Sequence, residues 1–203
     1  MASVTIVILA AGTGARMGGQ GNKLLAEFDG VPLVRRLALT ALASEADSVH
    51  VVVGNCSEAV RGALVSVPVQ FTENPHYGLG MSTSLKAGLA IEDVRHSDGV
   101  LVMLADMPLV TSVDLDRLIG AFKAGGGSSI IRAVSGSRPG NPVILPKSIY
   151  GVVAGLSGDI GARRIIDASS LAVVEVDIGD AAMVDADTPE AIEGAGGRVV
   201  ASN

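Results

Sequence analysis

An apolar run near the N-terminus breaks into a loop that is rich in glycine and carries two cations. The run 4–9 leads into Ala10-Ala11-Gly12, and the loop that follows contains Arg16 and Lys23. A buried strand that feeds such a loop presents backbone N–H groups and positive charge at its end, which suits a polyphosphate. The alternative is that Gly12 and Gly14 only allow a tight turn with a positive φ.

Two common phosphate-binding patterns do not fit this loop. The dinucleotide fingerprint G-x-G-x-x-G fails because three residues separate Gly14 from Gly18, and no Gly-Lys-Ser/Thr triplet occurs anywhere in the chain. The loop therefore predicts a nucleotide site of another kind.

The composition favours one α/β domain without a membrane segment. Of 203 residues, 48% are hydrophobic but only 2% are aromatic, so the core must consist of Val, Leu, Ile and Ala, as in a parallel sheet covered by helices. The net charge of −6 argues against nonspecific binding to nucleic acid or anionic membranes. No apolar run could span a membrane and no signal peptide begins the chain, so we expect a cytoplasmic protein.

Strands and helices are predicted to alternate along the chain. We expect strands over 4–9, 49–53, 67–71, 99–105, 129–133, 142–145 and 171–176, and helices over 32–43, 57–64, 82–90, 111–122, 146–153, 159–168 and 188–193. Ser57, Ser82, and Thr111 or Ser112 are the expected N-caps of three of the helices. This order predicts a doubly wound, mostly parallel sheet whose ligand lies at the carboxyl ends of strands. We expect one domain over 3–195, with an acceptor-side subregion over 132–160 and a tail over 196–203.

An acidic residue directly follows the apolar run 99–105. Asp106 precedes Met107-Pro108, and a carboxylate at the end of a buried strand is costly unless a cation compensates it. The alternative is a capping role in the turn that leads to the helix near Thr111.

A second acidic pair precedes the last predicted helix. Thr188-Pro189-Glu190 is a good helix start with Asp187 or Thr188 as the cap, but capping does not explain both Asp185 and Asp187. Mg²⁺ prefers carboxylate oxygens together with substrate phosphates. Asp106 and Asp187 are therefore the predicted Mg²⁺ ligands, with Asp185 as the alternative.

The ordered set of motifs resembles the molybdenum cofactor cytidylyltransferases, within the wider molybdopterin nucleotidyltransferase-like family. The motifs are the loop Leu9-Ala10-Ala11-Gly12 through Lys23, Gly80-Met81-Ser82-Thr83-Ser84-Leu85, Asp106-Met107-Pro108, Gly140-Asn141-Pro142-Val143, Gly158-Asp159-Ile160-Gly161-Ala162-Arg163 and Asp185-Ala186-Asp187-Thr188-Pro189. The resemblance implies a three-layer Rossmann-like sandwich of the nucleotide-diphospho-sugar transferase type. It also implies transfer of CMP from Mg-CTP to molybdenum-molybdopterin, with release of pyrophosphate.

The same resemblance implies a role for each matching residue. Leu9, Ala10, Ala11 and Gly12 would frame the base and ribose; the backbone of Gly12, Thr13, Gly14 and Ala15 would hold the triphosphate with Arg16 and Lys23; Asn74, Gly80, Met81 and Ser82 would face the nucleoside; Asp106 and Asp187 would hold Mg²⁺; and Asn141, Asp159 and Arg163 would face the acceptor. GTP-using relatives have a second glycine where this chain has Ala11, which favours CTP. The glycine-rich stretch 18–21 is longer than in many relatives, so the reach of Lys23 stays open.

The expected reaction requires no protein nucleophile. An acceptor phosphate oxygen that is already ionised attacks the α-phosphorus in line with the departing pyrophosphate, so positioning and charge neutralisation carry the catalysis. His50, His76 and His96 are therefore not needed as acids or bases. We expect His50 and His96 at the surface and His76 in a loop. Cys56, the single cysteine, is expected to be a small apolar residue rather than a nucleophile.

Other functions compete with this interpretation. Within the transferases, a guanylyl transfer or a sugar- or polyol-phosphate acceptor is possible. A carrier that delivers the matured cofactor to a molybdoenzyme could keep the pocket without needing both carboxylates. An oxidoreductase that uses a flavin or a nicotinamide is a third class, against which the failed dinucleotide fingerprint argues.

Overall fold

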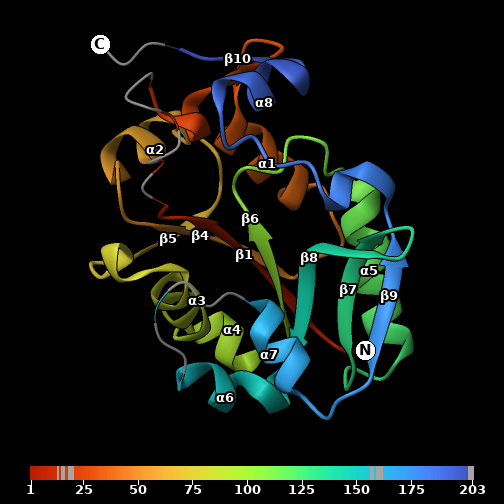
Figure 1. The fold of residues 1–203 in the computed structure, drawn as a ribbon. Helices are drawn as coiled ribbons and strands as arrows, with labels where there is room; N and C mark the ends of the chain where they lie inside the picture. The colour runs from red at the N-terminus through yellow and green to blue at the C-terminus, as the bar shows by residue number, and fades with distance from the viewer. Residues whose placement is uncertain (13, 15–16, 18–20, 156–157, 159–161, 201–203) are drawn as a thin grey trace.

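The computed structural model describes residues 1–12, 14, 17, 21–155, 158 and 162–200 (Figure 1). A seven-stranded sheet runs through the molecule in the order β5-β4-β1-β6-β8-β7-β9. Its strands are β1 (Val4–Ala10), β4 (Ser48–Val53), β5 (Gln70–Glu73), β6 (Gly99–Leu104), β7 (Ile130–Ser135), β8 (Arg138–Pro146) and β9 (Val173–Asp177). Among these, β8 alone runs antiparallel to its neighbours β6 and β7. The expected mostly parallel sheet is confirmed.

Helices cover both faces of this sheet and make it the middle of three layers (Figure 1). One face carries α1 (Leu33–Leu42), α2 (Ser57–Ala63) and α5 (Ser112–Ala124), with α8 (Pro189–Gly194) beside them; the other carries α3 (Met81–Leu89), α4 (Glu92–His96), α6 (Tyr150–Ala154) and α7 (Ala162–Ala168). Because side chains alternate along a strand, Ile6 and Ile8 of β1 pack in the first apolar core and Val7 in the second. The three-layer α/β fold predicted from the sequence is therefore confirmed.

Several predicted element boundaries were wrong for local reasons. The strand expected over 67–71 begins only at Gln70, because Pro68 has no N–H to donate to a ladder. The strand expected over 142–145 is the nine-residue β8, since a tight turn with Gly136 at φ +59° joins β7 to β8 as a hairpin. The helix expected over 146–153 is a 3-10 turn, η4 (Lys147–Ile149), followed by α6. For the helix expected over 159–168, residues 159–161 lie outside the described part and α7 begins at Ala162.

Two expected N-caps are also replaced by the residue before the helix. Cys56, with φ +56°, precedes α2, so Ser57 is its first helical residue. Gly80, with φ +104°, precedes α3 and places Ser82 inside the first turn. Thr111 is the N-cap of α5, as one of the two expected residues, and it forms a capping box with Asp114.

Two polar residues lie elsewhere than expected. His50 is 2% exposed rather than at the surface, because its Nε2 lies 2.9 Å from Asp93 Oδ2 of α4. Cys56 is exposed rather than packed as an apolar residue. His76 and His96 are exposed, and His76 precedes the short 3-10 turn η3 (Tyr77–Leu79).

A small second sheet was not predicted. It has the order β10-β2-β3, formed by β10 (Gly197–Arg198), β2 (Glu27–Phe28) and β3 (Val31–Pro32). Two-residue strands leave no periodic pattern in a sequence, so they escape detection. Residues 197–198, which we expected in a tail, are therefore paired in the fold.

The remaining elements are the 3-10 turns η2 (Lys23–Leu25) and η5 (Gly179–Ala182). Within the described residues, no helix combines the length and the apolar character that crossing a bilayer requires.

The close approach of α3 to β1 depends on a glycine. A Cβ atom on buried Gly88 would lie 2.7 Å from Val7 Cγ1, whereas one on exposed Gly120 of α5 would meet no heavy atom within 4 Å. We predict that Gly88→Ala lowers the free energy of unfolding by about 1–3 kcal/mol through overpacking. The matched control Gly120→Ala should raise it by about 0.5–1 kcal/mol through helix propensity. Urea unfolding of both variants tests the prediction, and a stabilised Gly88→Ala variant would contradict it.

Candidate nucleotide site

The site lies where the chain order of the sheet reverses. From β1 the chain proceeds to β4 on one side, while β6 pairs with β1 on the other side. The loop after β1 and Asp106 after β6 therefore emerge next to each other, and the Ala105 N–H donates to the Leu9 carbonyl over 3.2 Å. Such a switch point is the usual ligand site in open α/β sheets.

The loop after β1 is described in part. Gly14 adopts φ +63°, and its carbonyl accepts a hydrogen bond from the N–H of Met17, which is buried in the core. Gly21 also has a positive φ, at +118°. The turn role of Gly14 is thus seen directly, whereas Thr13, Ala15 and Arg16 lie outside the described residues.

Lys23 is positioned by the short turn η2 that closes this loop. The Asn22 side chain accepts a hydrogen bond from the Leu24 N–H over 3.0 Å, and Leu24 is buried in the core. The Lys23 carbonyl accepts a hydrogen bond from the Ala26 N–H. These contacts hold the backbone of Lys23 while its long side chain extends toward the end of β6.

The Lys23 ammonium lies between two carboxylates from distant parts of the chain. Its Nζ is 2.5 Å from Asp106 Oδ2 and 2.5 Å from Asp187 Oδ1. The side chains of Lys23 and Asp106 are each 14% exposed and that of Asp187 is 20% exposed. A 2.7 Å hydrogen bond from the Ala186 N–H to the Asp106 carbonyl aligns the segment before α8 with the end of β6. The structure therefore brings together the two predicted Mg²⁺ ligands and the lysine that was expected at the triphosphate.

The electrostatics of this cluster keep the lysine charged. Burial alone would lower the pKa of Lys23, but the Coulombic attraction of Asp106 and the hydrogen bonds to Asp106 and Asp187 outweigh it and raise the pKa above the ordinary value. The cluster thus contains one positive and two negative charges and retains a net charge of about −1.

The two carboxylates fit a cation site. Oxygens from both acids converge on one point, and Asp106 Oδ1 is buried and accepts no hydrogen bond from the described residues. The described part of the chain contains no group of three or more His, Cys, Asp or Glu side chains that could hold a metal. Two carboxylates are the set with which Mg²⁺ is commonly bound when substrate phosphates supply further oxygens.

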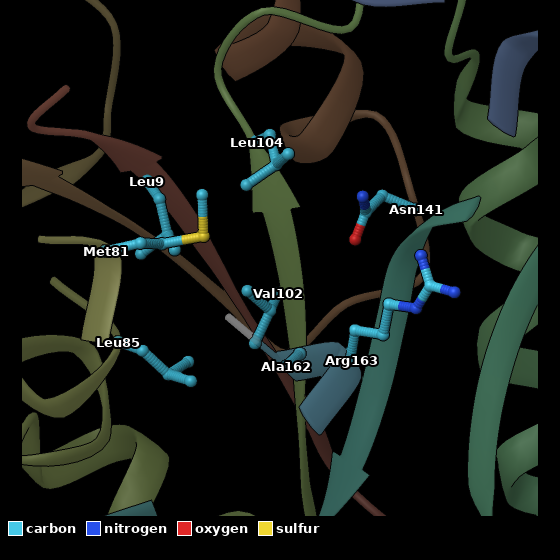
Figure 2. A pocket seen from close by; sticks show the side chains of 8 residues that line it. All are labelled: Leu9, Met81, Leu85, Val102, Leu104, Asn141, Ala162 and Arg163. Carbon is cyan, nitrogen blue, oxygen red and sulfur yellow. The ribbon is translucent and has the colours of Figure 1, made fainter. Parts of the chain in front are cut away.

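A pocket of about 230 Å³ opens on the α3 and α7 side of the sheet (Figure 2). Its apolar wall comes from β1, β6 and α3, and its polar end from β8 and α7; the lining residues are Leu9, Met81, Leu85, Val102, Leu104, Asn141, Ala162 and Arg163. In Figure 2 the guanidinium of Arg163 extends toward the Asn141 amide. Leu9 and Met81, expected at the nucleotide, and Asn141 and Arg163, expected at the acceptor, thus line one pocket, while Asp159 lies outside the described residues.

The side chain of Asn74, a predicted nucleoside contact, is bonded within the protein. Its side chain is 2% exposed; its amide donates to Thr83 Oγ1 and Ser84 Oγ, and its Oδ1 accepts from the His76 N–H. The neighbouring Ser82 is fully buried as well, although its Oγ makes no hydrogen bond with the described residues. Asn74 therefore holds the 76–80 loop on α3, because its polar atoms are already occupied.

The Ala11 side chain also faces the protein. It is 2% exposed and packs in the second apolar core, and a Cβ atom added to Gly54 would lie 2.9 Å from the Ala11 methyl. The methyl group thus packs between neighbouring segments of the protein and does not line an open pocket.

Comparison with known proteins agrees with this fold. A structure of Rv0371c from Mycobacterium tuberculosis in complex with manganese superimposes with a TM-score of 0.77 at 22% identity, covering 96% of this chain and 98% of that one. The bifunctional protein GlmU of Halorhodospira halophila is 36% identical over 132 residues, which span 65% of this chain but only 26% of that protein. The nicotine blue oxidoreductase of Paenarthrobacter nicotinovorans is 32% identical over 193 residues, 92% of this chain and 93% of that one.

The fold and the site define the class first: an α/β protein with the fold of a solved nucleotidyl transferase and a pocket beside the switch point of its sheet. A family model for the MobA-like NTP transferase domain matches residues 6–174. The chain belongs to this family.

The internal bonding of Asn74 generates a prediction that separates structure from ligand binding. Asn74→Ala leaves buried hydroxyls and a backbone N–H without their partner, so we expect the free energy of unfolding to fall by about 1–3 kcal/mol. Thr83→Ser, which keeps the hydroxyl, is the matched control and should unfold like the unmodified protein. If Asn74→Ala unfolds normally but loses nucleotide affinity in calorimetry, Asn74 contacts the ligand and the structural role is wrong.

Proposed function

We propose that this protein is a cytidylyltransferase that transfers CMP from CTP to molybdenum-molybdopterin and releases pyrophosphate. The family supports nucleotidyl transfer, and the motifs around Ala11, Asn141 and Arg163 support the finer assignment. The observation that carries the proposal is the convergence of Lys23, Asp106 and Asp187 at the end of β6, beside the glycine-rich loop. This is the arrangement that a metal–triphosphate complex needs at a strand end.

Asp106 and Asp187 would hold Mg²⁺, because their oxygens already converge on one cation. Bound there, the ion would neutralise phosphate charge as pyrophosphate leaves. Asp106 is the stronger candidate of the two, since its second oxygen is buried without a hydrogen-bond donor among the described residues. Asp185 remains the alternative to Asp187.

The protein's own groups act by positioning and by charge. Arg16, Lys23 and the backbone N–H groups of residues 12–15 would hold the triphosphate so that the α-phosphorus faces the acceptor. An acceptor phosphate oxygen then forms a bond to the α-phosphorus, and the bond to the β-phosphate oxygen breaks, so that pyrophosphate leaves with the electron pair. The acceptor oxygen is already ionised, so no side chain must remove a proton.

The pocket supplies a place for the nucleoside and the acceptor side by side. Leu9 and Met81 would pack against the nucleoside, with Gly80 at the start of α3 allowing close approach. Asn141 and Arg163 at the polar end would bind an anionic or hydrogen-bonding part of the acceptor. Arg163 is 85% exposed and 4.0 Å from Asp167, so its guanidinium can turn toward a ligand.

Because the Ala11 methyl is buried, its effect on base choice would act through the backbone path at the end of β1. The segment Leu9-Ala10-Ala11-Gly12 would then present its main chain to the base. The size of the Ala11 side chain would set the distance between this main chain and Gly54. We therefore keep CTP as the proposed nucleotide and a molybdoenzyme as the proposed recipient of the product. GTP, a sugar- or polyol-phosphate acceptor, and a carrier without turnover are the alternatives within this fold.

One observation favours a second candidate function. A relative that matches this chain over nearly its whole length is named as an oxidoreductase. An oxidoreductase would bind a flavin or a nicotinamide in the same pocket, where the apolar wall suits a flat ring. Titration of the purified protein with a flavin or a reduced nicotinamide, followed by absorbance and fluorescence, tests this second function, because a protein that binds neither cofactor would contradict it.

We predict that Asp106→Asn keeps the fold and lowers Mg²⁺-dependent pyrophosphate release by about 10²-fold or more, as expected when a preorganised electrostatic contact is lost at the reacting phosphates. Asp187→Asn should have a comparable effect and Asp185→Asn a small one. Pyrophosphate release with and without EDTA is the measurement, with thermal unfolding to confirm the fold. Normal turnover of Asp106→Asn would refute the metal assignment.

We also predict that CTP is used in preference to GTP by about 10–200-fold in kcat/KM, the range that a misfit of a few atoms produces in a close-packed pocket. Initial rates with each nucleotide, with and without molybdenum-loaded molybdopterin, test both base and acceptor. Equal rates with the two nucleotides would refute the cytidylyltransferase proposal. Pyrophosphate release at the same rate with and without molybdenum-loaded molybdopterin would refute molybdopterin as the acceptor.

A further inference from the structure

The position of the Lys23 ammonium coincides with the position that a metal would need. A divalent ion held by both Asp106 and Asp187 has to lie between the same two oxygens that are each 2.5 Å from Lys23 Nζ. Ligand distances for Mg²⁺ are about 2.0–2.1 Å, so an ammonium and a metal ion cannot occupy this space together. One cation must leave before the other can bind both acids.

The lysine compensates part of the negative charge of this site. All three side chains are at most 20% exposed, so the two carboxylates would repel each other strongly if no cation lay between them. Lys23 reaches them on a flexible four-carbon stem from a turn whose backbone is held by Asn22 and by buried Leu24. The stem can swing while the turn stays in place.

We propose that Lys23 is an internal cation that excludes divalent metal from Asp106 and Asp187 until a triphosphate draws its ammonium away. The inference rests on the proposed nucleotidyl transfer, in which Lys23 has phosphate oxygens as its second partner. Lys23 is then a positioning residue in the free protein and a phosphate ligand in the complex. Metal without nucleotide binds weakly, and metal with nucleotide binds as one unit.

The proposal predicts that removing the charge of Lys23 increases the affinity of the site for a metal ion. Lys23→Met keeps much of the apolar stem and removes the charge, so Mn²⁺ alone should bind this variant more tightly than the unmodified protein. We expect an increase of about 5–150-fold, the usual range for two coupled binding events. Mn²⁺ titration followed by electron paramagnetic resonance, in the absence of nucleotide, measures it directly.

Two controls define the site. Lys123→Met removes the lysine of a surface pair in the last turn of α5, 3.4 Å from Glu45, and should leave Mn²⁺ affinity unchanged. Lys23→Met combined with Asp187→Asn should lose the gain, because the second carboxylate is then neutral. Lys23→Gln serves as a second neutral variant if Lys23→Met does not fold in a thermal unfolding assay.

The outcomes separate this inference from the proposed function. If a folded Lys23→Met or Lys23→Gln variant binds Mn²⁺ no more tightly than the unmodified protein, Lys23 does not exclude metal and the inference is wrong. Pyrophosphate release by the unmodified protein tests the transferase separately. A gain in Mn²⁺ affinity without any turnover in the unmodified protein would support the exchange and overturn the transferase proposal.

Discussion

The need to compensate two carboxylates at the end of a buried strand organises this molecule. Asp106 follows β6 in the middle of the sheet, and Asp187 is brought to it by the backbone hydrogen bond between Ala186 and Asp106. Neither acid is stable there alone, since buried negative charge is costly. The Lys23 turn, the segment before α8 and the end of β6 are therefore tied to one point, and that point is also where a triphosphate is expected to arrive.

The sequence predicted the layers of this fold well because its strongest signals are apolar runs and apolar residues at helical spacing. The apolar runs at 4–9 and 99–105 and the helical spacing at 32–43 are clear signals, and β1, β6 and α1 match them closely. The antiparallel direction of β8 and the two-residue strands β2, β3 and β10 were missed. Strand direction depends on partners elsewhere in the chain, and very short strands carry no period.

The candidate site was predictable in its residues but not in their contacts. Lys23, Asp106 and Asp187 each stood out by position, but their meeting depends on the Ala186 hydrogen bond, which no local pattern encodes. For Asn74 and Ala11, the sequence did not predict the orientation of the side chain. The family resemblance predicts both at the nucleotide, yet their side chains are buried within the protein, because a resemblance marks a position in the chain and not the direction of a side chain.

The small sheet joins the C-terminal part of the chain to the turn that carries Lys23. Residue Gly197 pairs with Phe28, where a Cβ atom would lie 2.5 Å from the phenyl ring, and Arg198 lies 2.7 Å from Glu27. β2 begins only two residues after η2 ends. Residues nearly at opposite ends of the sequence are therefore paired in one sheet. A displacement or cleavage of the chain at residues 197–198 would disturb β2 and, through it, the turn that positions Lys23 in the site.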